Sequence, residues 1–373
     1  MGAPDDHRLF AQKRQVAPPT DPLREVFTYR VLNSWRESQA PSPELVFRLG
    51  IVEVCGPYPC DLRKADSLRT LRALKAAWEA YLLAAFTCGM FAGEKRKDLL
   101  GRLRGVDDDG FRSAMAECMA CWFFSGRMKL PVAPQAPGRG RKNLDMWIST
   151  QDGGIAVEAK APFREAPMPP PGRSIGCWVA DDSEKIAQCL EAANRQFDKN
   201  GPNLLVIAPR LLVRMFSERQ DLAKAIYGES KITVPINVQT GEPGPTDVKF
   251  FPDGKFLNTV RPGGKPLKAD GLPGYRRISA VVTIEEKIVE KHPYPSPFAL
   301  LDREHLAEIW PMWKRENRLH YSTDNMKWVE HDVLVLHNPF AYHPVSPEMW
   351  KRFPQFVEVY GEMKWTDRYG AEA

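Results

Sequence analysis

The 373-residue sequence lacks any apolar run of about 18 residues, the length that crosses a bilayer as a helix. The opening segment, MGAPDDHRLFAQKRQ, holds no apolar core of a secretory signal, and Asp6 stands where a myristoylation signal requires Ser or Thr. The seven cysteines are odd in number and scattered along the chain. These absences predict a protein with no membrane partner that stays in the reducing cytoplasm.

Three common enzyme signatures are also absent. The chain has no G-x-S-x-G nucleophile elbow, no P-loop and no dinucleotide-binding glycine fingerprint. A net charge of +5 and a pI near 8.7 are compatible with a nucleic-acid partner and too small to indicate one alone. With 43% hydrophobic and 27% charged residues, the composition is that of an ordinary globular protein.

The pattern of the chain predicts four regions. Residues 1–24 are rich in proline and charge and are expected to form a flexible arm. Residues 25–105 form an N-terminal accessory region, and its clearest helix is predicted at Ser67–Thr87, where apolar residues recur at helical spacing. Residues 106–210 are predicted to be the central domain, and residues 211–373 a C-terminal α/β extension, either on the same core or as a second domain.

Within residues 106–210 the elements are expected to alternate. The predicted order is helix, strand, hairpin, helix, strand, at 108–124, 128–132, 144–161, 183–197 and 203–208. Further along, we expect helices at 211–227 and 299–316 and strands at 278–284 and 333–336. This order predicts the α/β class, with a central mixed β-sheet flanked by helices and elaborated at both ends.

The hairpin reads LDMWISTQDGGIAVEAKA from Leu144 to Ala161. Asp152-Gly153 is a two-residue turn signal, because both residues tolerate the positive φ that such turns need. With that turn, Asp145 would lie opposite Lys160, and Trp147 opposite Glu158. The register predicts which residues share a face of the hairpin.

Side chains alternate along a strand, so Glu158 and Lys160 share one face, and a cross-strand partner such as Asp145 joins them. The other face is apolar and is expected to meet the core: Leu144, Met146, Ile148, Ile155, Val157 and Ala159. Charged groups on such a hairpin are costly unless they are solvated, paired or bound to metal. The plain alternative to a functional site is therefore an amphipathic hairpin with a solvated charged face.

This set of side chains suits metal-assisted hydrolysis of a phosphodiester. Mg²⁺ prefers oxygen ligands and takes one or two carboxylates together with phosphate and water. The bound ion polarises a phosphoryl oxygen and lowers the pKa of a water. A lysine beside it orients that water or stabilises the developing negative charge. Asp145 and Glu158 are the candidate metal ligands, and Lys160 is the candidate catalytic lysine.

The pattern resembles the PD-(D/E)xK, or restriction-endonuclease-like, nuclease superfamily. The resemblance rests on Asp145, a spacer, and Glu158-Ala159-Lys160, and it covers roughly residues 107–208. Position 144 is Leu where the motif nominally has Pro. The resemblance implies a restriction-endonuclease-like core and a Mg²⁺- or Mn²⁺-dependent nuclease that acts on DNA rather than RNA. A homodimer is also compatible with it.

The resemblance also assigns supporting residues. Family members often add a glutamate from the preceding helix, and Glu117 is the best-placed candidate for this third metal ligand. The following helix often carries a Gln or Lys that faces the site, which implies Lys185, Gln188 or Gln196. Arg139, Arg141 and Lys142 precede Asp145 and are candidates for contacts with a phosphate backbone, the alternative being a solvated basic loop.

Other patterns compete with this assignment. Of three further acid-x-Lys motifs, Glu285-x-Lys287 competes most seriously, because it ends an apolar strand, but its upstream acid, Asp270, lies in a Gly/Pro-rich loop. His331, His337 and His343 suggest a metal site in the C-terminal third, although packing or loop hydrogen bonds explain them more simply. Two alternative functions remain: a catalytically inactive nuclease-fold module that binds nucleic acid or a protein, and an enzyme whose chemistry lies around these histidines.

Overall fold

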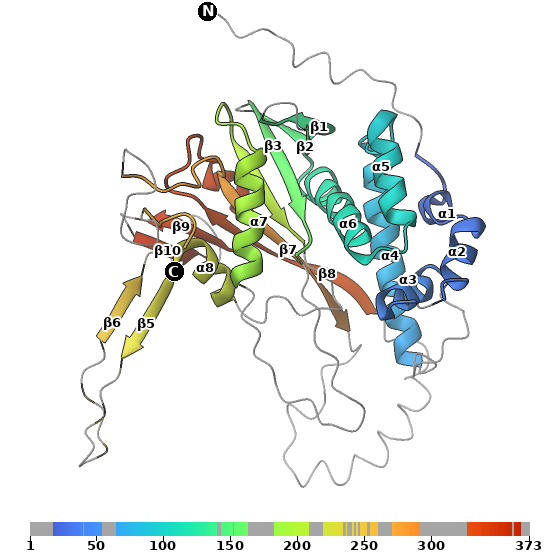
Figure 1. Cartoon of the computed structure of the whole chain (residues 1–373), viewed down its shortest axis with the longest axis horizontal. Coiled ribbons are helices and arrows are strands. Elements are labelled where there is room, and N and C mark those ends of the chain that lie inside the picture. The colour runs from blue at the N-terminus through green and yellow to red at the C-terminus, as the bar shows by residue number, and fades with distance from the viewer. Residues whose placement is uncertain are drawn as a thin grey trace, which may run out of the picture. The chain divides into compact units, whose positions relative to one another are not determined.

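The computed structural model describes residues 18–39, 41–53, 65–139, 143–151, 153–162, 183–208, 219–233, 236, 241, 244, 247–251, 254–259, 271–290, 327–359 and 362–366. Within them the chain is mixed α/β, as predicted, with helices flanking a mixed sheet (Figure 1). In these parts of the chain no helix is long and apolar enough to cross a membrane.

The main sheet joins strands from the predicted core with strands from the C-terminal extension. Its order is β1-β2-β3-β4-β7-β8-β9-β10. β1–β2, β2–β3 and β9–β10 pair antiparallel, whereas β3–β4, β4–β7 and β8–β9 pair parallel. The strands span β1 Val132–Pro137, β2 Asn143–Thr150, β3 Gly153–Lys160, β4 Asn203–Ile207, β7 Ala280–Glu290, β8 Lys327–His337, β9 Gln355–Val359 and β10 Glu362–Thr366.

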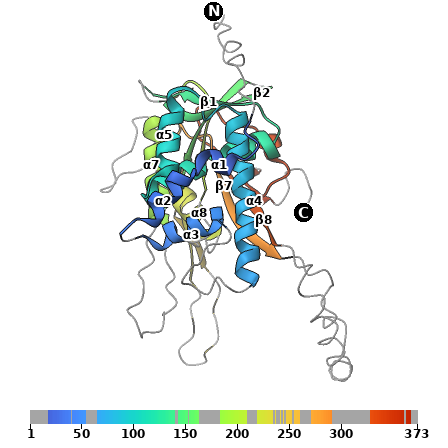
Figure 2. The same cartoon turned by 90° about the vertical axis from the view of Figure 1, so that its right-hand side faces the viewer.

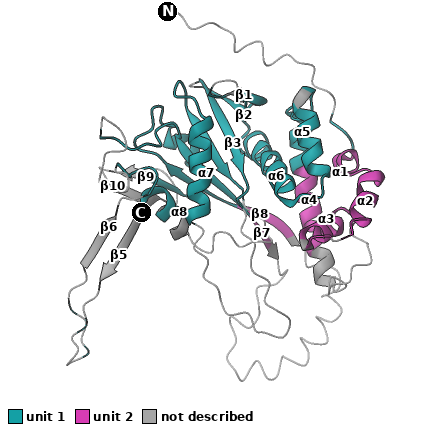
Figure 3. Cartoon of the chain, in the orientation of Figure 1, with its two compact units in different colours: residues 1–20, 81–285, 332–373 teal, residues 21–80, 286–331 magenta. Residues whose placement is uncertain are grey.

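The chain divides into two compact units (Figure 3). Unit 1 comprises residues 1–20, 81–285 and 332–373, and unit 2 comprises residues 21–80 and 286–331. The divisions fall within helix α4 and strands β7 and β8, at other places than the predicted boundaries after 105 and 210. The residues that carry the candidate site all belong to unit 1.

Unit 2 is helical where the structure describes its N-terminal part. It contains α1 (Pro22–Val26), α2 (Tyr29–Arg36), α3 (Pro43–Glu53) and most of α4 (Ala65–Thr87). Phe27 packs against Trp35 and Trp78, with ring centroids 5.4 and 6.4 Å apart. The predicted arm was therefore wrong at its C-terminal end: Asp21 caps α1, and Leu23 is buried.

The helices of unit 1 begin and end at local sequence signals. α6 (Asp108–Trp122) starts at Asp107, whose side chain accepts a hydrogen bond from Gly110 N at 2.7 Å. A five-residue π-helix, η2 (Phe123–Arg127), follows it directly. The predicted helix at 108–124 is thus confirmed, but the predicted strand at 128–132 was wrong, because β1 begins at Val132. The described residues of unit 1 also form α5 (Gly93–Arg104), α7 (Ser183–Gln196) and α8 (Arg219–Tyr227).

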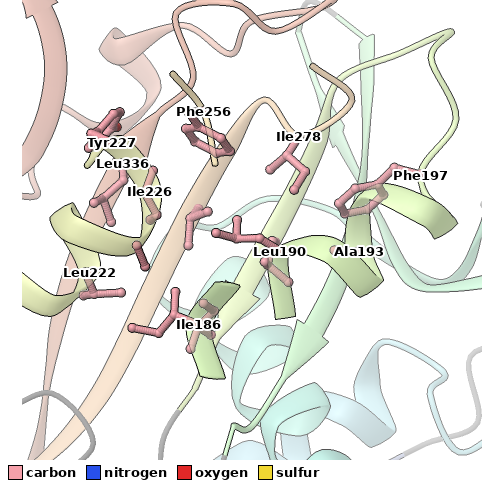
Figure 4. Packing of buried hydrophobic residues seen from close by; sticks show 14 of the residues in the cluster. Ile186, Leu190, Ala193, Phe197, Leu222, Ile226, Tyr227, Phe256, Ile278 and Leu336 are labelled. Atoms are coloured by element: carbon pink, nitrogen blue, oxygen red, sulfur yellow. The ribbon is translucent and has the colours of Figure 1, made fainter. Parts of the chain in front are cut away.

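The main apolar cluster lies between one face of the sheet and helices α7 and α8 (Figure 4). Ile186, Leu190 and Ala193 recur along α7 at helical spacing, and each is fully buried. They meet sheet residues such as Leu205 and Val281. A small two-stranded sheet, β5 (Glu229–Thr233) with β6 (Asp247–Phe251), follows α8 in the chain.

The β2–β3 hairpin forms with a different register from the predicted one. Thr150 pairs with Gly153, so residues 151 and 152 connect the strands, one position earlier than the predicted Asp152-Gly153 turn. Every pair shifts by two residues, and Trp147 pairs with Ala156 instead of Glu158. A shift by two preserves the side-chain alternation, because strand residues repeat faces with a period of two.

The hairpin's predicted apolar face is confirmed, because all six of its residues are buried: Leu144, Met146, Ile148, Ile155, Val157 and Ala159. Gly153 has a φ of 126°, which explains the glycine at this point. The predicted helix at 299–316 and residues 211–218 of the helix predicted at 211–227 lie outside the described residues.

Candidate functional site

The candidate site lies where β2 separates from β3 and where its pairing with β1 is interrupted for one residue. The β1–β2 ladder pairs Pro134 with Met146 and Ala136 with Leu144, and it skips Asp145. The β2–β3 ladder ends at the Met146–Val157 pair. Opposite Asp145 on β1 lies Gln135, whose φ of 60° is in the left-handed region that is uncommon outside glycine. The backbone of β1 is thus irregular opposite the predicted catalytic aspartate, and such irregularity is frequent at functional sites.

The Asp145 carboxylate replaces the missing ladder contact. Its Oδ2 atom accepts a hydrogen bond of 2.9 Å from the backbone N–H of Ala159 on β3. Asp145 therefore does not lie opposite Lys160, as the predicted register required. It reaches instead to the backbone between Glu158 and Lys160, so the aspartate and the E-A-K motif still meet.

Glu158 and Lys160 form an ion pair at the end of β3. Lys160 Nζ donates to Glu158 Oε1 at 2.5 Å, and the two side chains are 27% and 6% exposed respectively. Burial, and next the charge of Asp145, raise the pKa of Glu158 to about 7, although Lys160 opposes this. The Lys160 pKa is also raised, because the charges of Glu158 and Asp145 outweigh the effect of burial.

Glu117 enters the same cluster from helix α6, which packs against β3. Its side chain is 3% exposed. Burial raises the Glu117 pKa, and the charge of Asp145 raises it further, whereas Lys95 and Arg102 oppose the rise. The three carboxylates predicted as metal ligands thus come from α6, β2 and β3 and repel one another electrostatically.

Two cations that the sequence analysis did not assign complete the cluster. Lys95 Nζ lies 2.8 Å from Glu117 Oε2 and 3.0 Å from Asp145 Oδ1. Arg102 Nη1 lies 2.7 Å from Glu117 Oε1 and also binds Asp98. Both cations belong to α5, which lies beside β1 and β2 (Figure 2). Lys95 and Arg102 are seven residues apart, so they lie on one face of a helix formed by the basic segment GEKRKDLLGRLRG. This spacing was the only feature of the sequence that could have identified them as site residues.

An open cleft adjoins this cluster. It has a volume of about 260 Å³ and lies between α5 and the first two strands of the sheet. Its lining residues are Lys95, Asp98, Arg102, Gln135, Asn143, Leu144 and Asp145. Asp145 and Lys95 line the cleft, whereas Glu117 and Glu158 are buried and are not among its lining residues.

The residues predicted on α7 do not reach the cluster as expected. Lys185 and Gln188 are exposed, and Gln196 contributes a backbone carbonyl that accepts from the Arg139 N–H at 2.7 Å. The α7 residue electrostatically coupled to Lys160 is Cys189, and burial raises its thiol pKa to about 11. The resemblance assigned Gln or Lys to this role, so the cysteine at the inward position was missed.

The predicted basic contacts are described only at one position. Arg139 is exposed, whereas Arg141 and Lys142 lie outside the described residues. Of the competing patterns, Asp270 also lies outside them. His337 is buried and hydrogen-bonded to Gln355 Oε1 at 2.9 Å, and His343 binds the Lys199 carbonyl at 3.0 Å. Within the described ranges no histidine belongs to a cluster that could hold a metal ion.

The donor set of the cluster has the chemistry of a divalent-cation site. Its oxygens are carboxylates, which Mg²⁺ and Mn²⁺ prefer. Glu117 Oε2 is buried and accepts no hydrogen bond from the described part of the chain; its 2.8 Å approach to Lys95 is an ion pair without hydrogen-bond geometry. In this structure, however, the described residues contain no group of three Asp, Glu, His or Cys side chains close enough together to hold a metal ion. The Lys95 ammonium lies between Glu117 and Asp145.

Comparison with known proteins finds no matching family model, no matching curated protein and no matching solved structure.

Proposed function

We propose that this protein is a Mg²⁺- or Mn²⁺-dependent phosphodiesterase that cleaves nucleic acid, DNA rather than RNA. The observation that carries the proposal is the meeting of Asp145, Glu158 and Glu117 with Lys160 at one end of the β2–β3 hairpin. Buried acids that raise one another's pKa are typical of a functional site. In an apolar core such carboxylates are costly unless a cation compensates their charge.

The order of elements around the site supports the same proposal. α6, β1, β2, β3, α7 and β4 follow one another in the chain, with an antiparallel meander and then a parallel strand. This αβββαβ order is what a restriction-endonuclease-like core requires. In such a core the aspartate of β2 and the acid-x-Lys motif of β3 meet at one end of the sheet, where Asp145, Glu158 and Lys160 lie here.

The residues would divide the reaction as follows. Asp145 and Glu158, with Glu117 behind them, would hold the metal ion through carboxylate oxygens. The ion, when bound, would supply Lewis acidity toward a phosphoryl oxygen. Lys160 Nζ, held by Glu158, would orient the attacking water and stabilise negative charge that develops on the phosphate. The Ala159 N–H would fix the Asp145 carboxylate through its 2.9 Å hydrogen bond.

Cleavage of supercoiled plasmid and linear duplex DNA tests the proposal. With Mg²⁺ or Mn²⁺ present, Asp145→Asn and Lys160→Met should each lower the rate by about 10²-fold or more, since each removes a group that acts on the reacting phosphate. Glu191→Gln, the same kind of change at a half-buried α7 carboxylate paired with Arg195, is the matched control. Wild-type protein that does not cut DNA, or variants as active as wild type, would contradict the proposal.

A second candidate is a nuclease-fold module that binds nucleic acid or a protein without cleaving. The observation that favours it is the Lys95 ammonium between Glu117 and Asp145, because three carboxylates are then balanced by Lys95, Arg102 and Lys160. Calorimetric titration with Mn²⁺ separates the candidates. Heat of binding that disappears in Asp145→Asn supports the enzyme, and its absence in the wild type, with DNA bound but uncut, supports the module.

A further inference from the structure

Lys95 holds the oxygens that a metal ion would need. Its ammonium donates to Asp145 Oδ1 at 3.0 Å, lies 3.4 Å from the Asp145 carbonyl oxygen, and pairs with Glu117 Oε2 at 2.8 Å. Its side chain is only 10% exposed. A lysine in the first turn of a helix is disfavoured by the helix dipole, so these acids are what stabilise it there. Lys95 thus acts as a bound cation supplied by the chain itself.

Two features make this cation removable. Lys95 lines the 260 Å³ cleft as well as contacting the buried acids, and the flexible four-carbon stem of a lysine lets its ammonium take more than one position. Arg102, Gln135 and Asn143 also line the cleft, and side chains of these types can donate hydrogen bonds to a phosphate. A phosphate there would offer the ammonium a new anionic partner.

We propose, on the basis of the proposed nuclease site, that Lys95 is a tethered competitor of the metal ion: the ammonium and a divalent cation exclude each other at Glu117 and Asp145. A phosphodiester in the cleft draws the ammonium away, so metal and nucleic acid bind with positive coupling. The coupling is reciprocal, since each ligand must raise the affinity for the other by the same factor. The protein without nucleic acid therefore holds metal weakly.

Mn²⁺ binding, measured by the loss of the free-ion electron paramagnetic resonance signal, tests the competition without reference to activity. Lys95→Gln should bind Mn²⁺ about tenfold more tightly than the wild type, because an uncharged side chain leaves the oxygens available. Lys95→Arg keeps the charge and should not gain affinity. Lys97→Met, at an exposed lysine of the same helix, is the matched control. Equal affinity in Lys95→Gln and wild type, or binding by neither, overturns the competition.

Thermal unfolding provides a second readout on the same variants. Without metal, Lys95→Gln should melt below the wild type, because Glu117 and Asp145 lose a buried counter-charge. Mn²⁺ should raise its melting temperature by more than it raises that of the wild type. If Lys95→Gln does not fold without metal, folding that depends on added Mn²⁺ supports the proposal, and failure to fold with Mn²⁺ overturns it.

The coupling to nucleic acid is tested with a short DNA duplex carrying phosphorothioate linkages. The duplex should raise the Mn²⁺ affinity of the wild type about tenfold and that of Lys95→Gln hardly at all, after subtraction of Mn²⁺ bound by the duplex alone. No effect on the wild type overturns the coupling. Plasmid cleavage is measured separately, so that the two proposals can fail independently. If the wild type cleaves DNA but Lys95→Gln binds Mn²⁺ no more tightly, the role of Lys95 as competitor is rejected. If the protein binds Mn²⁺ tightly but does not cleave DNA, the nuclease function is rejected.

Discussion

At the residue scale, His337 shows how burial decides the state of a titratable group. It lies at the end of β8, 8% exposed, and its ring binds Gln355 Oε1 while its carbonyl accepts from the Tyr227 hydroxyl at 2.6 Å. Burial lowers its pKa to about 4, although the hydrogen bond to Gln355 favours the charged form and opposes this shift. The residue is a buried structural histidine, which was the simpler of the two interpretations of its sequence pattern.

His337 should make the protein less stable in acid. Because its pKa is lower in the folded state, the unfolded chain binds more protons between about pH 6.5 and pH 4, and stability falls as the pH falls through this window. At pH 5 the loss should be about 2 kcal/mol relative to neutral pH. Urea unfolding at pH 7.5 and pH 5 should show a smaller loss for His337→Gln than for the wild type.

The control for this prediction is His343→Gln, the same change at an exposed histidine that binds a backbone carbonyl. It should retain the wild-type loss of stability between pH 7.5 and pH 5. An equal acid loss in His337→Gln and wild type would show that His337 is not the group responsible.

At the scale of the element, the β2–β3 hairpin depends on Gly154. It pairs with Ser149, and the Trp147 ring covers it so closely that an added Cβ would lie 1.6 Å from the ring atom Cζ2. A glycine under an aromatic ring is therefore a packing requirement of the hairpin that carries Asp145 and Glu158. The turn signal and the alternation predicted a hairpin here but gave no sign of this contact.

Gly154→Ala should destabilise the protein by about 1–3 kcal/mol, because the Trp147 ring must move out of its packed position. Urea unfolding measures the loss. Gly201→Ala, where an added Cβ meets nothing within 4 Å, is the matched control and should change stability much less. In a double-mutant cycle, Trp147→Ala should remove most of the penalty, since the two positions are coupled by contact. Strictly additive effects would contradict the packing argument.

At the scale of the whole molecule, the sheet extends beyond the region that resembled a nuclease core. β4 pairs with β3 on one side and with β7 on the other, and its residues Leu204 to Ile207 are fully buried. η4 (Pro347–Trp350) also returns to the core, where Trp350 packs on Phe123 and Phe124 of η2. The C-terminal residues are thus part of the fold that holds the site.

A fragment of residues 106–210 should therefore fail to fold cooperatively. Without β7 it would expose the edge of β4, an unpaired apolar strand that favours aggregation. Without α5 it would also leave Glu117 and Asp145 without Lys95 and Arg102. Circular dichroism during urea titration should show a broad, non-cooperative change beside the sharp transition of the full chain. A cooperative transition in the fragment would show that the smaller region is a self-contained domain.

The sequence by itself determined the local helices and strands, and it placed two residues of the candidate site, Glu158 and Lys160, beside each other. Helical spacing placed α6 and α7, alternation gave the buried face of the hairpin, and the two-residue spacing of Glu158 and Lys160 put them on one face. These features depend on residues close in the chain. Even the wrong turn position left the alternation intact, because the register moved by two residues.

Only the tertiary structure decided what surrounds Asp145. Its contact with Lys95 joins residues fifty positions apart, and the partner of the Asp145 carboxylate is a backbone N–H of β3 that is available because the β2–β3 ladder stops before it. The joining of β7 to β4 likewise pairs strands that are far apart in the chain, at Ala280–Glu290 and Asn203–Ile207. Such contacts follow from how buried charges are neutralised and how strand edges are covered, which no spacing along the chain encodes.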